Sequence, residues 1–364
     1  PGAVTMGRMN APADLRILLC ADTHLGFDEP VRPRVERRRR GPDFFATFQR
    51  VLDRAREIRA DLVVHGGDLF FRSRVPPAIV DRVYRMLWSL ADDGIPLAIV
   101  PGNHERSVLP SSLFLSHPNL HVFLRPETRV FDLRGTKVAL TGIPCARDGV
   151  RGRFGALLAA ADWAGTPGDA RFLCLHQAIE GAQVGPADFT FRAGDDVVRM
   201  ADLPPEFDAV LAGHIHRAQI LFRRRPDGTT MPVLYPGSTE RTSFAEMREP
   251  KGYFELSLRG VPGPGRRSLA YAFTPLPARP MREIVLGPEI RDPGAARAFL
   301  QAQFALLEPD AVVRLRWAEA VPFDARNAVT GALLREIAPP AMNLELGGAG
   351  RAGPGRNDRY RRAH

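Results

Sequence analysis

The chain has 364 residues, of which 45% are hydrophobic and 25% charged, as is ordinary for a soluble globular protein of one or two domains. It has no apolar run long enough to cross a bilayer and no continuous apolar stretch near its start, so we expect neither a membrane-spanning segment nor a secretory signal. The net charge of +9 permits a polyanionic partner, although all but two of the 50 basic residues are arginines, a skew that base composition can also produce.

The first part of the chain alternates between strand and helix patterns. Short apolar runs at 15–20, 61–65 and 96–100 are typical of buried strands. Between them, segment 44–59 has apolar residues at helical spacing, and segment 76–91 has proline near its first turn, as many helices do. This order predicts a βαβ series.

The middle of the chain is richer in strands. Seven further apolar strands are predicted at 120–124, 137–143, 171–175, 208–212, 218–222, 231–235 and 252–258. Because the later ones lie close together between Gly and Pro turns, we expect a second sheet packed on the first.

Composition then divides the chain. The Gly- and Pro-rich segment 259–268 is predicted to be a linker that separates a large domain, 15–258, from a small one, 269–344. Residues 1–14 and the Gly- and Arg-rich residues 345–364 are expected to be disordered. The three widely spaced cysteines do not suggest a disulfide framework and indicate a reducing compartment, so we expect a cytoplasmic protein.

Residues with metal-binding chemistry follow five of the predicted strands. They are Asp22, His24, Asp68, Asn103, His104, His176, His214 and His216. The carboxyl ends of strands are where sites form in open α/β sheets, and oxygen and nitrogen donors of this kind suit Mn, Fe or Zn. Any one of these motifs alone is more often a surface or core pair, but all five in this order predict a metal site.

Spacing within the motifs supports a shared site. On an extended segment, residues i and i+2 point the same way, so Asp22 with His24, and His214 with His216, can each offer two ligands to one pocket. Asp68 can bridge two ions about 3.5–4 Å apart. Glycines precede Asp68 and two other members of the set and would let the backbone turn tightly there.

The motif series resembles the calcineurin-like metallophosphoesterase superfamily, whose motifs run Asp-x-His, Gly-Asp, Gly-Asn-His-Asp/Glu, His and Gly-His-x-His. The resemblance implies a four-layer α/β/β/α sandwich with a small α+β capping domain, and two divalent metal ions. It assigns Asp22, His24 and His216 to one ion, Asn103, His176 and His214 to the other, and Asp68 to both. His104 would then be the acid for the leaving oxygen or would stabilise the phosphoryl charge.

Three further segments resemble the SbcD and meiotic-recombination-eleven DNA repair nucleases. Residues 67–77 resemble their Gly-Asp-Leu-Phe segment, and residues 235–241 resemble their Tyr-Pro-Gly-Ser-x-Glu-Arg segment, which Lys251-Gly252-Tyr253 follows in both. The small domain resembles their DNA-capping domain in element order. The resemblance implies Mn²⁺-dependent exonuclease or endonuclease action on DNA, with an SbcC-like ATPase and a homodimer as further partners.

Two departures from the family pattern bear on these expectations. Many relatives have a histidine, associated with positioning the phosphate for exonuclease work, where this chain has Phe71, which cannot donate a hydrogen bond or carry charge. Exonuclease activity is therefore open. The family's ATPase binds helices beyond the cap, whereas here only a short helix, near 327–337, is predicted, so no ATPase site is evident.

Two other functions stay open. A hydrolase of small phosphoesters, such as cyclic nucleotides, would use the same residues, but the cap-like domain and residues 235–241 favour DNA. A non-catalytic scaffold that binds DNA or an ATPase would not need a complete ligand set. Metal content and activity without DNA would separate these possibilities.

Charged and titratable residues near the motifs have alternative interpretations. The predicted DNA contacts are Arg37, Arg38, Arg39 and Arg40. A solvated loop explains the same basic run. His65 either supports a metal ligand or is a satisfied core histidine. Glu105 is expected to support the loop of Asn103 and His104 rather than to bind metal.

Overall fold

The computed structural model describes residues 14–28, 39–105, 109, 116–259, 268–318, 321 and 326–347. The chain divides into two compact units. The first contains residues 1–27, 43–240 and 249–276, and the second contains residues 28–42, 241–248 and 277–364. No helix among the described residues is both long enough and apolar enough to span a membrane.

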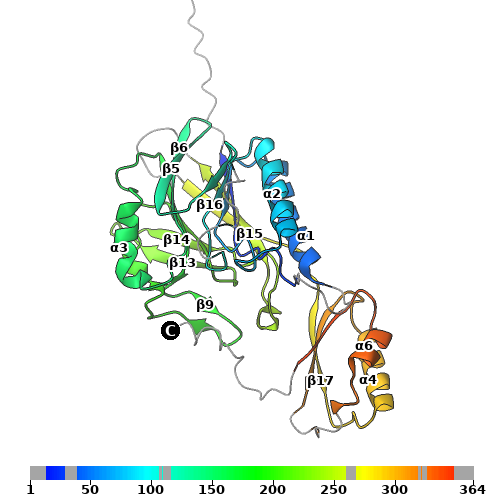
Figure 1. The fold of residues 1–364 in the computed structure, drawn as a ribbon. Coiled ribbons are helices and arrows are strands. Elements are labelled where there is room, and N and C mark those ends of the chain that lie inside the picture. Colours follow the sequence, from blue (N-terminus) through cyan, green and yellow to red (C-terminus); the bar gives the residue numbers. More distant parts are fainter. Residues whose placement is uncertain are drawn as a thin grey trace, which may run out of the picture. The chain divides into compact units, whose positions relative to one another are not determined.

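The first sheet of the first unit has six strands in the order β16-β15-β1-β2-β3-β4 (Figure 1). Their bounds are β1 Leu15–Cys20, β2 Leu62–His65, β3 Leu97–Ile99, β4 Leu120–Val122, β15 Gly252–Arg259 and β16 Ser268–Pro275. Strands β1 to β4 are parallel, and β15 and β16 add an antiparallel edge. Helix α1, Gly41–Glu57, and helix α2, Pro77–Asp92, connect the first three strands and confirm the predicted βαβ series.

The second sheet also has six strands, in the order β13-β14-β12-β7-β6-β5. Their bounds are β5 Glu127–Leu133, β6 Thr136–Ile143, β7 Ala170–His176, β12 Ala209–Gly213, β13 Gln219–Arg224 and β14 Thr230–Tyr235. Helix α3, Val150–Ala160, connects β6 and β7. Shorter pieces are β8 Ala178–Ile179, β9 Gln183–Val184, β10 Phe189–Thr190, β11 Val197–Val198 and the 3-10 turn η2 Met200–Asp202. Neither β5 nor α3 was predicted from the sequence.

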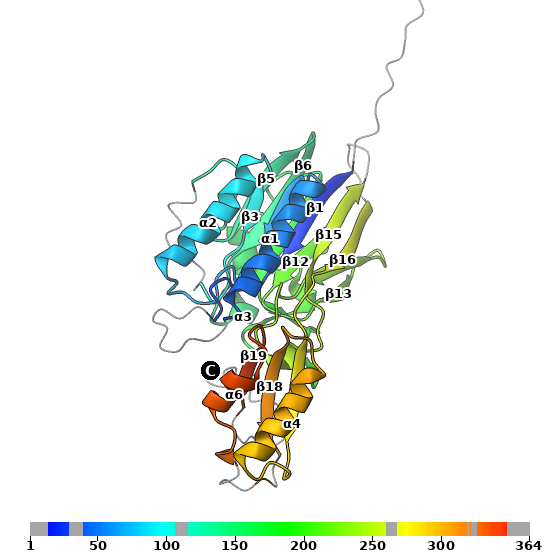
Figure 2. The ribbon, with the colours of Figure 1, turned by 90° about the vertical axis from the view of Figure 1, so that its right-hand side faces the viewer.

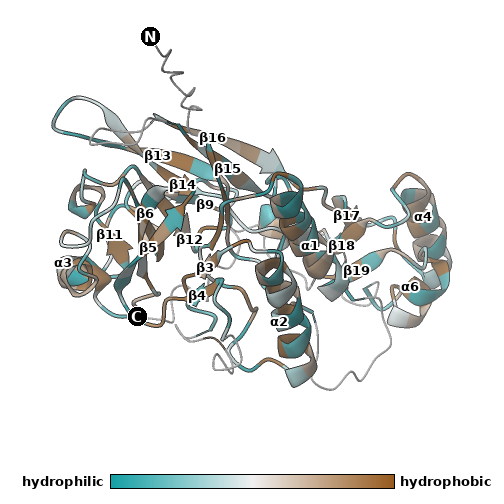
Figure 3. Cartoon of the chain, turned by 90° about the horizontal axis from the view of Figure 1, so that it is seen from above, coloured by the Kyte–Doolittle hydropathy of each residue, from teal (hydrophilic) through white to brown (hydrophobic). Residues whose placement is uncertain are grey.

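Three apolar clusters hold this unit together in four layers (Figure 1), and Figure 2 faces the layer of α1 and α2. The first lies between α1, α2 and the outer face of the first sheet, where Phe44 and Phe48 of α1 are fully buried. The second fills the space between the two sheets, and the third joins the second sheet to α3. Both α1 and α2 carry alternating hydrophobic and hydrophilic stripes along the helix (Figure 3). Each large side chain buried this way stabilises the fold by about 1.5–3 kcal/mol. The expected α/β/β/α sandwich is confirmed.

The second unit is built on a parallel sheet of order β17-β18-β19. Its elements are β17 Met281–Leu286, α4 Pro293–Ala305, β18 Val312–Trp317, α6 Gly331–Ile337, β19 Asn343–Leu346 and the 3-10 turn η3 Phe244–Glu246. Both helices begin at a side-chain cap: Asp292 accepts from the N–H of Ala295, and Thr330 accepts from the N–H of Leu333.

The boundary between the units differs from the predicted linker at 259–268. Strand β16, which the sequence analysis placed in the small domain, pairs with β15 along its whole length and belongs to the first unit. The compact second unit resumes at residue 277. Residues 1–13, 260–267 and 348–364, where disorder or a linker was expected, lie outside the described residues.

Candidate metal centre

The eight predicted site residues all lie at the carboxyl ends of strands in the first unit. Five follow the parallel strands of the first sheet: Asp22 and His24 after β1, Asp68 after β2, and Asn103 and His104 after β3. Three come from the second sheet: His176 at the end of β7, and His214 and His216 after β12. The site therefore takes residues from both sheets.

Asp22, His24 and His216 form one group. Nε2 of His24 lies 2.8 Å from Nε2 of His216, and the same atom of His216 lies 3.9 Å from Oδ1 of Asp22. One donor atom from each residue lies within 4.8 Å of the others. Two imidazole nitrogens and a carboxylate oxygen aimed at one point are a donor set that suits a divalent cation.

Asn103, His176 and His214 form a second group. Oδ1 of Asn103 lies 3.0 Å from Nε2 of His176 and 3.0 Å from Nδ1 of His214. The other ring nitrogen of His176, Nδ1, lies 2.8 Å from the carbonyl oxygen of Gly66. A proton on Nδ1 would be donated to that carbonyl, which leaves the Nε2 lone pair directed at the site.

Asp68 lies between the two groups. Its Oδ2 atom is 3.4 Å from Nε2 of His176 and 4.0 Å from Nε2 of His24. Its Oδ1 atom accepts a hydrogen bond of 2.9 Å from the backbone N–H of His104. One carboxylate thus faces both groups, as a bridging ligand must.

The His104 side chain is 34% exposed, more than that of His216, which is 25% exposed. The side chains of His24 and His176 are fully buried. The Nε2 atom of His104 lies 3.8 Å from Oδ2 of Asp68, and its Nδ1 atom contacts the carbonyl oxygen of Phe71. With Nδ1 held in this way, Nε2 is the nitrogen that can exchange a proton with a substrate.

The backbone at four of the seven predicted ligands is left-handed rather than extended. Asp22, His24, Asp68 and His214 have φ values of 51°, 46°, 53° and 88°. A non-glycine residue in this region costs of the order of 1–3 kcal/mol. Backbone hydrogen bonds from the N–H of Asp22 to Gly67, and from the N–H of His24 to Asp68, hold the conformation. The sequence analysis expected the side chains of Asp22 and His24, and of His214 and His216, to point the same way along extended segments. That expectation is wrong, because turns in the backbone bring these side chains together.

The glycines at the site have two separate roles. Gly67, with φ of 103°, adopts the turn that was predicted for all three glycines. Gly102 and Gly213 allow close approach instead, because a Cβ atom at Gly102 would lie 2.1 Å from Oδ1 of Asp68, and one at Gly213 would lie 2.1 Å from the carbonyl oxygen of Gly66.

Burial and mutual charge shift the pKa values of the site residues. Burial raises the pKa of Asp22. For Asp68, burial also acts to raise the pKa, but the charges of His176, His24 and His104 outweigh it and hold the pKa well below its usual range. Although burial opposes it, Asp68 raises the pKa of His176 to about 9. The buried Asp68 carboxylate is thus stabilised by a protonated His176, and bound cations could take the same role.

Comparison with known proteins places this geometry in a family. The calcineurin-like phosphoesterase family matches residues 15–218, which is more than half of the chain and contains every predicted ligand. The chain belongs to the calcineurin-like phosphoesterase family.

Relatives of this phosphoesterase include proteins named "DNA double-strand break repair protein Mre11". The one from Archaeoglobus fulgidus is 27% identical over 62% of this chain and 50% of the relative. The one from Halobacterium salinarum is 32% identical over 65% of this chain and 55% of the relative. The chain spans about half the length of the curated relatives it matches. A solved dimetal phosphatase from Danio rerio aligns with a TM-score of 0.39 at 12% identity, covering 70% of this chain and 98% of the phosphatase.

Two buried residues tie the phosphoesterase's ligand loops together. Nδ1 of His65 accepts from the N–H of Gly67 at 3.2 Å, and its Nε2 lies 3.0 Å from the hydroxyl of Thr23. Burial lowers the pKa of His65 to about 3, so the ring is neutral. Glu105 accepts from the N–H groups of Phe70 and Gly102 at 2.6 and 2.8 Å. Glu105 thus joins the loops after β2 and β3, in the supporting position expected from the sequence.

The predicted basic contacts are only partly described. Arg37 and Arg38 lie outside the described residues. Both Arg39 and Arg40 contact Asp28: Nη1 of Arg39 lies 3.5 Å from Oδ1, and the backbone N–H of Arg40 donates to Oδ2 at 2.9 Å. These residues belong to the second unit. Their contact with DNA stays a prediction.

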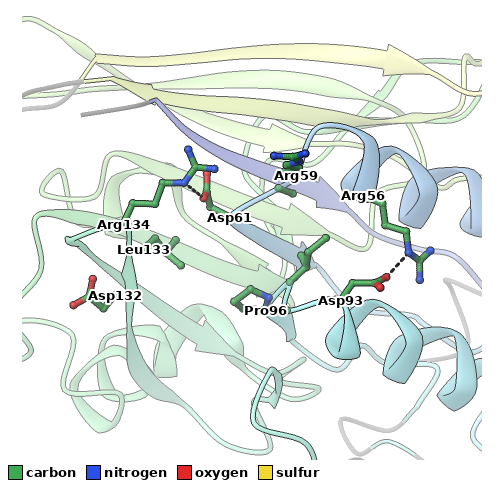
Figure 4. Close-up of a pocket in the computed structure, with 11 residues that line it drawn as sticks. Arg56, Arg59, Asp61, Asp93, Pro96, Asp132, Leu133 and Arg134 are labelled. Carbon is green, nitrogen blue, oxygen red and sulfur yellow. Dashed lines mark hydrogen bonds and ion pairs between the residues drawn. The ribbon is translucent and has the colours of Figure 1, made fainter. Parts of the chain in front are cut away.

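A cleft in the first unit is a separate feature (Figure 4). It has a volume of about 570 Å³ and lies where β2 and β3 begin, with Asp61 and Pro96 in its wall. The parallel strands begin here, and the candidate ligands lie where they end. Ion pairs join Arg134 to Asp61 and Arg56 to Asp93 across its lining. This cleft contains none of the predicted ligands.

Proposed function

We propose that this phosphoesterase uses two divalent metal ions to hydrolyse phosphodiester bonds in DNA. The observation that carries the proposal is the convergence of six oxygen and nitrogen donors, in two groups of three, on either side of the Asp68 carboxylate. Such an arrangement is the one that a two-metal centre requires.

The proposed ligand sets follow the two groups. Asp22, His24 and His216 would hold one ion, Asn103, His176 and His214 would hold the other, and Asp68 would contribute to both sites. When bound, two cations neutralise phosphate oxygens and favour attack by water at neutral pH. We propose Mn²⁺ as the ion, since the mixed carboxylate, amide and imidazole donors suit it.

His104 is proposed to act on the leaving group. Its exposed Nε2 can carry a proton to the departing oxygen, while the contact of Nδ1 with the Phe71 carbonyl fixes the ring's orientation. The backbone N–H of the same residue donates to Asp68, and this hydrogen bond fixes the position of the proposed acid relative to the proposed bridging carboxylate.

The proposal of DNA as the substrate rests on similarity and charge. The proteins it resembles are named as DNA double-strand break repair proteins, and the chain carries a net charge of +9. An SbcC-like ATPase and a second copy of the chain are proposed as partners on the same resemblance. A cytoplasmic location is proposed because Cys20, Cys145 and Cys174 form no disulfide, as is usual in a reducing compartment.

Release of nucleotides from end-labelled duplex and single-stranded DNA with Mn²⁺ tests this proposal. We expect degradation by the parent protein and a loss of about 10²–10⁴-fold in His104→Asn, which keeps the metal ligands. A chromogenic phosphodiester is assayed in parallel. Cleavage of the small ester without cleavage of DNA, even with a partner ATPase added, would overturn the DNA assignment.

A further inference from the structure

Lys251 stands out against the composition of the chain. It is one of only two lysines among 50 basic residues, the other being Lys137. Lys137 is exposed on β6, as a charged side chain usually is. The side chain of Lys251 is fully buried instead. Burial of an ammonium group is costly unless hydrogen bonds and a counter-charge compensate it, so its partners identify its role.

The partners of Lys251 lie at the candidate metal centre. Its Nζ atom donates to the carbonyl oxygen of His216 at 2.8 Å and to Oε2 of Glu249 at 3.2 Å. The other oxygen of Glu249 accepts from Nε of Arg217 at 3.1 Å. Glu249 therefore supplies the counter-charge for Lys251. The network of hydrogen bonds contacts both His216 and Arg217.

Strand register explains how a residue so distant in sequence reaches this place. Strand β15 runs antiparallel to β1 with Leu19 opposite Phe254, so β15 starts beside the carboxyl end of β1, where Asp22 follows. Lys251 immediately precedes β15. The carbonyl oxygen of His216 also accepts from the N–H of Ser238 at 3.1 Å, so two donors fix it.

We infer that Lys251 is a positioning residue for the metal centre, which fixes the backbone of His216 so that its imidazole meets His24 and Asp22. The inference rests on the proposed function, because it assumes that His216 binds an ion. The geometry also explains why lysine stands here in an arginine-rich chain. A single ammonium fits between one carbonyl and one carboxylate, whereas a planar guanidinium is larger and needs a fork of acceptors.

Binding of Mn²⁺ to purified Lys251→Met tests this role, with Lys137→Met as the matched control. Free Mn²⁺ is measured by electron paramagnetic resonance during titration, at a temperature where circular dichroism shows each variant folded. We expect two ions in the parent and in Lys137→Met. In Lys251→Met we expect one ion to bind about 10–100-fold more weakly, the size of effect seen for groups that orient metal ligands, and the other ion to bind as in the parent.

Nitrogen-15 resonances of the histidine rings provide a second readout. In samples without Mn²⁺, the chemical shifts of the His216 ring in Lys251→Met should differ from those in the parent protein. The chemical shifts of His176, in the other ligand group, should be unchanged. Equal weakening of both ions, or parent affinity for both, would overturn the inference. If Lys251→Met does not fold, Lys251→Gln is measured in its place with the same expectations. A parent that binds no ions would instead contradict the proposed function.

Discussion

The parallel strands of the first unit have carboxylates at both ends, but the two ends neutralise them differently. Where the strands begin, Asp61 and Asp93 each meet an arginine at 2.6 Å. Where they end, Asp22 and Asp68 are buried, and the groups that face them at 3.4–4.0 Å are imidazoles, which are positive only when protonated. A guanidinium is permanently charged, whereas an imidazole can give up its proton. Only the second end can therefore exchange its own positive charge for metal ions.

Removing the bridging carboxylate should have the largest effect. Asp68→Asn keeps the side-chain volume and loses the charge that faces both ligand groups. We expect both Mn²⁺ ions to bind more than about 100-fold more weakly, beyond the effect of an orienting group, and hydrolysis to be lost. Equilibrium dialysis and the nuclease assay measure this. The matched control, Asp93→Asn at the opposite end, should bind both ions; loss of ions there as well would erase the contrast between the two ends.

Phe71 is an apolar side chain at the carboxyl ends of the parallel strands, where the candidate ligands lie. Its ring centroid lies 5.9 Å from that of His24 and 5.7 Å from that of His104. Phe71→His adds a donor that can reach a phosphate, and we expect exonucleolytic release to rise about 10–100-fold, as for a hydrogen bond to a charged group worth about 1.5–3 kcal/mol. End-labelled DNA with Phe222→His, an exposed position on β13, as control checks this. Unchanged release would mean that the absence of a hydrogen-bond donor at position 71 does not limit exonuclease activity.

His65 allows the ligand end to be tested by pH. Its pKa is lowered from 6.5 to about 3, so below pH 6.5 the unfolded chain binds the proton and the folded one does not. Stability from this group is therefore present above pH 6.5 and is lost as the pH falls toward 3, by up to about 1.4 kcal/mol per unit. Denaturant unfolding of metal-free parent and His65→Gln should show a shallower acid slope in the variant. Equal slopes would contradict a neutral, buried ring.

The smallest effect is expected at the cleft end. Arg134→Met breaks an ion pair whose arginine is 46% exposed, and such pairs contribute about 0–1 kcal/mol. We expect a small change in the free energy of unfolding and unchanged hydrolysis. If hydrolysis fell with Mn²⁺ binding intact, the cleft would be part of the working surface and the two ends would not be separate.

Local patterns predicted much of the first unit. The apolar runs that became β1, β2 and β3 and the helical spacing of α1 and α2 are local signals. Strand β5 was missed because its alternation is half-exposed and polar, and α3 was missed because glycines at 152 and 155 weaken its helical pattern. Strand β16 was placed in the wrong unit, because the Gly- and Pro-rich segment before it resembles a domain linker. Its pairing with β15 is a tertiary contact that the local sequence does not indicate.

The candidate site was easier to predict than its supports. Each ligand motif combines rare residue types at a strand end, so sequence alone selects it. The role of Lys251 and the requirement for glycine at position 102 both depend on contacts between segments far apart in the chain. No local spacing encodes such contacts. The left-handed φ values at Asp22 and His24 also escaped prediction, because non-glycine residues adopt this conformation only rarely.

The origin of the ligands in both sheets has a consequence for the life of the chain during synthesis. On the proposed assignment, His216 completes the set begun by Asp22 and His24, and His176 and His214 complete the set begun by Asn103. Neither ion can be fully held until the second sheet has emerged and docked on the first. On the proposed function, a nascent or truncated chain without the second sheet should therefore lack hydrolytic activity.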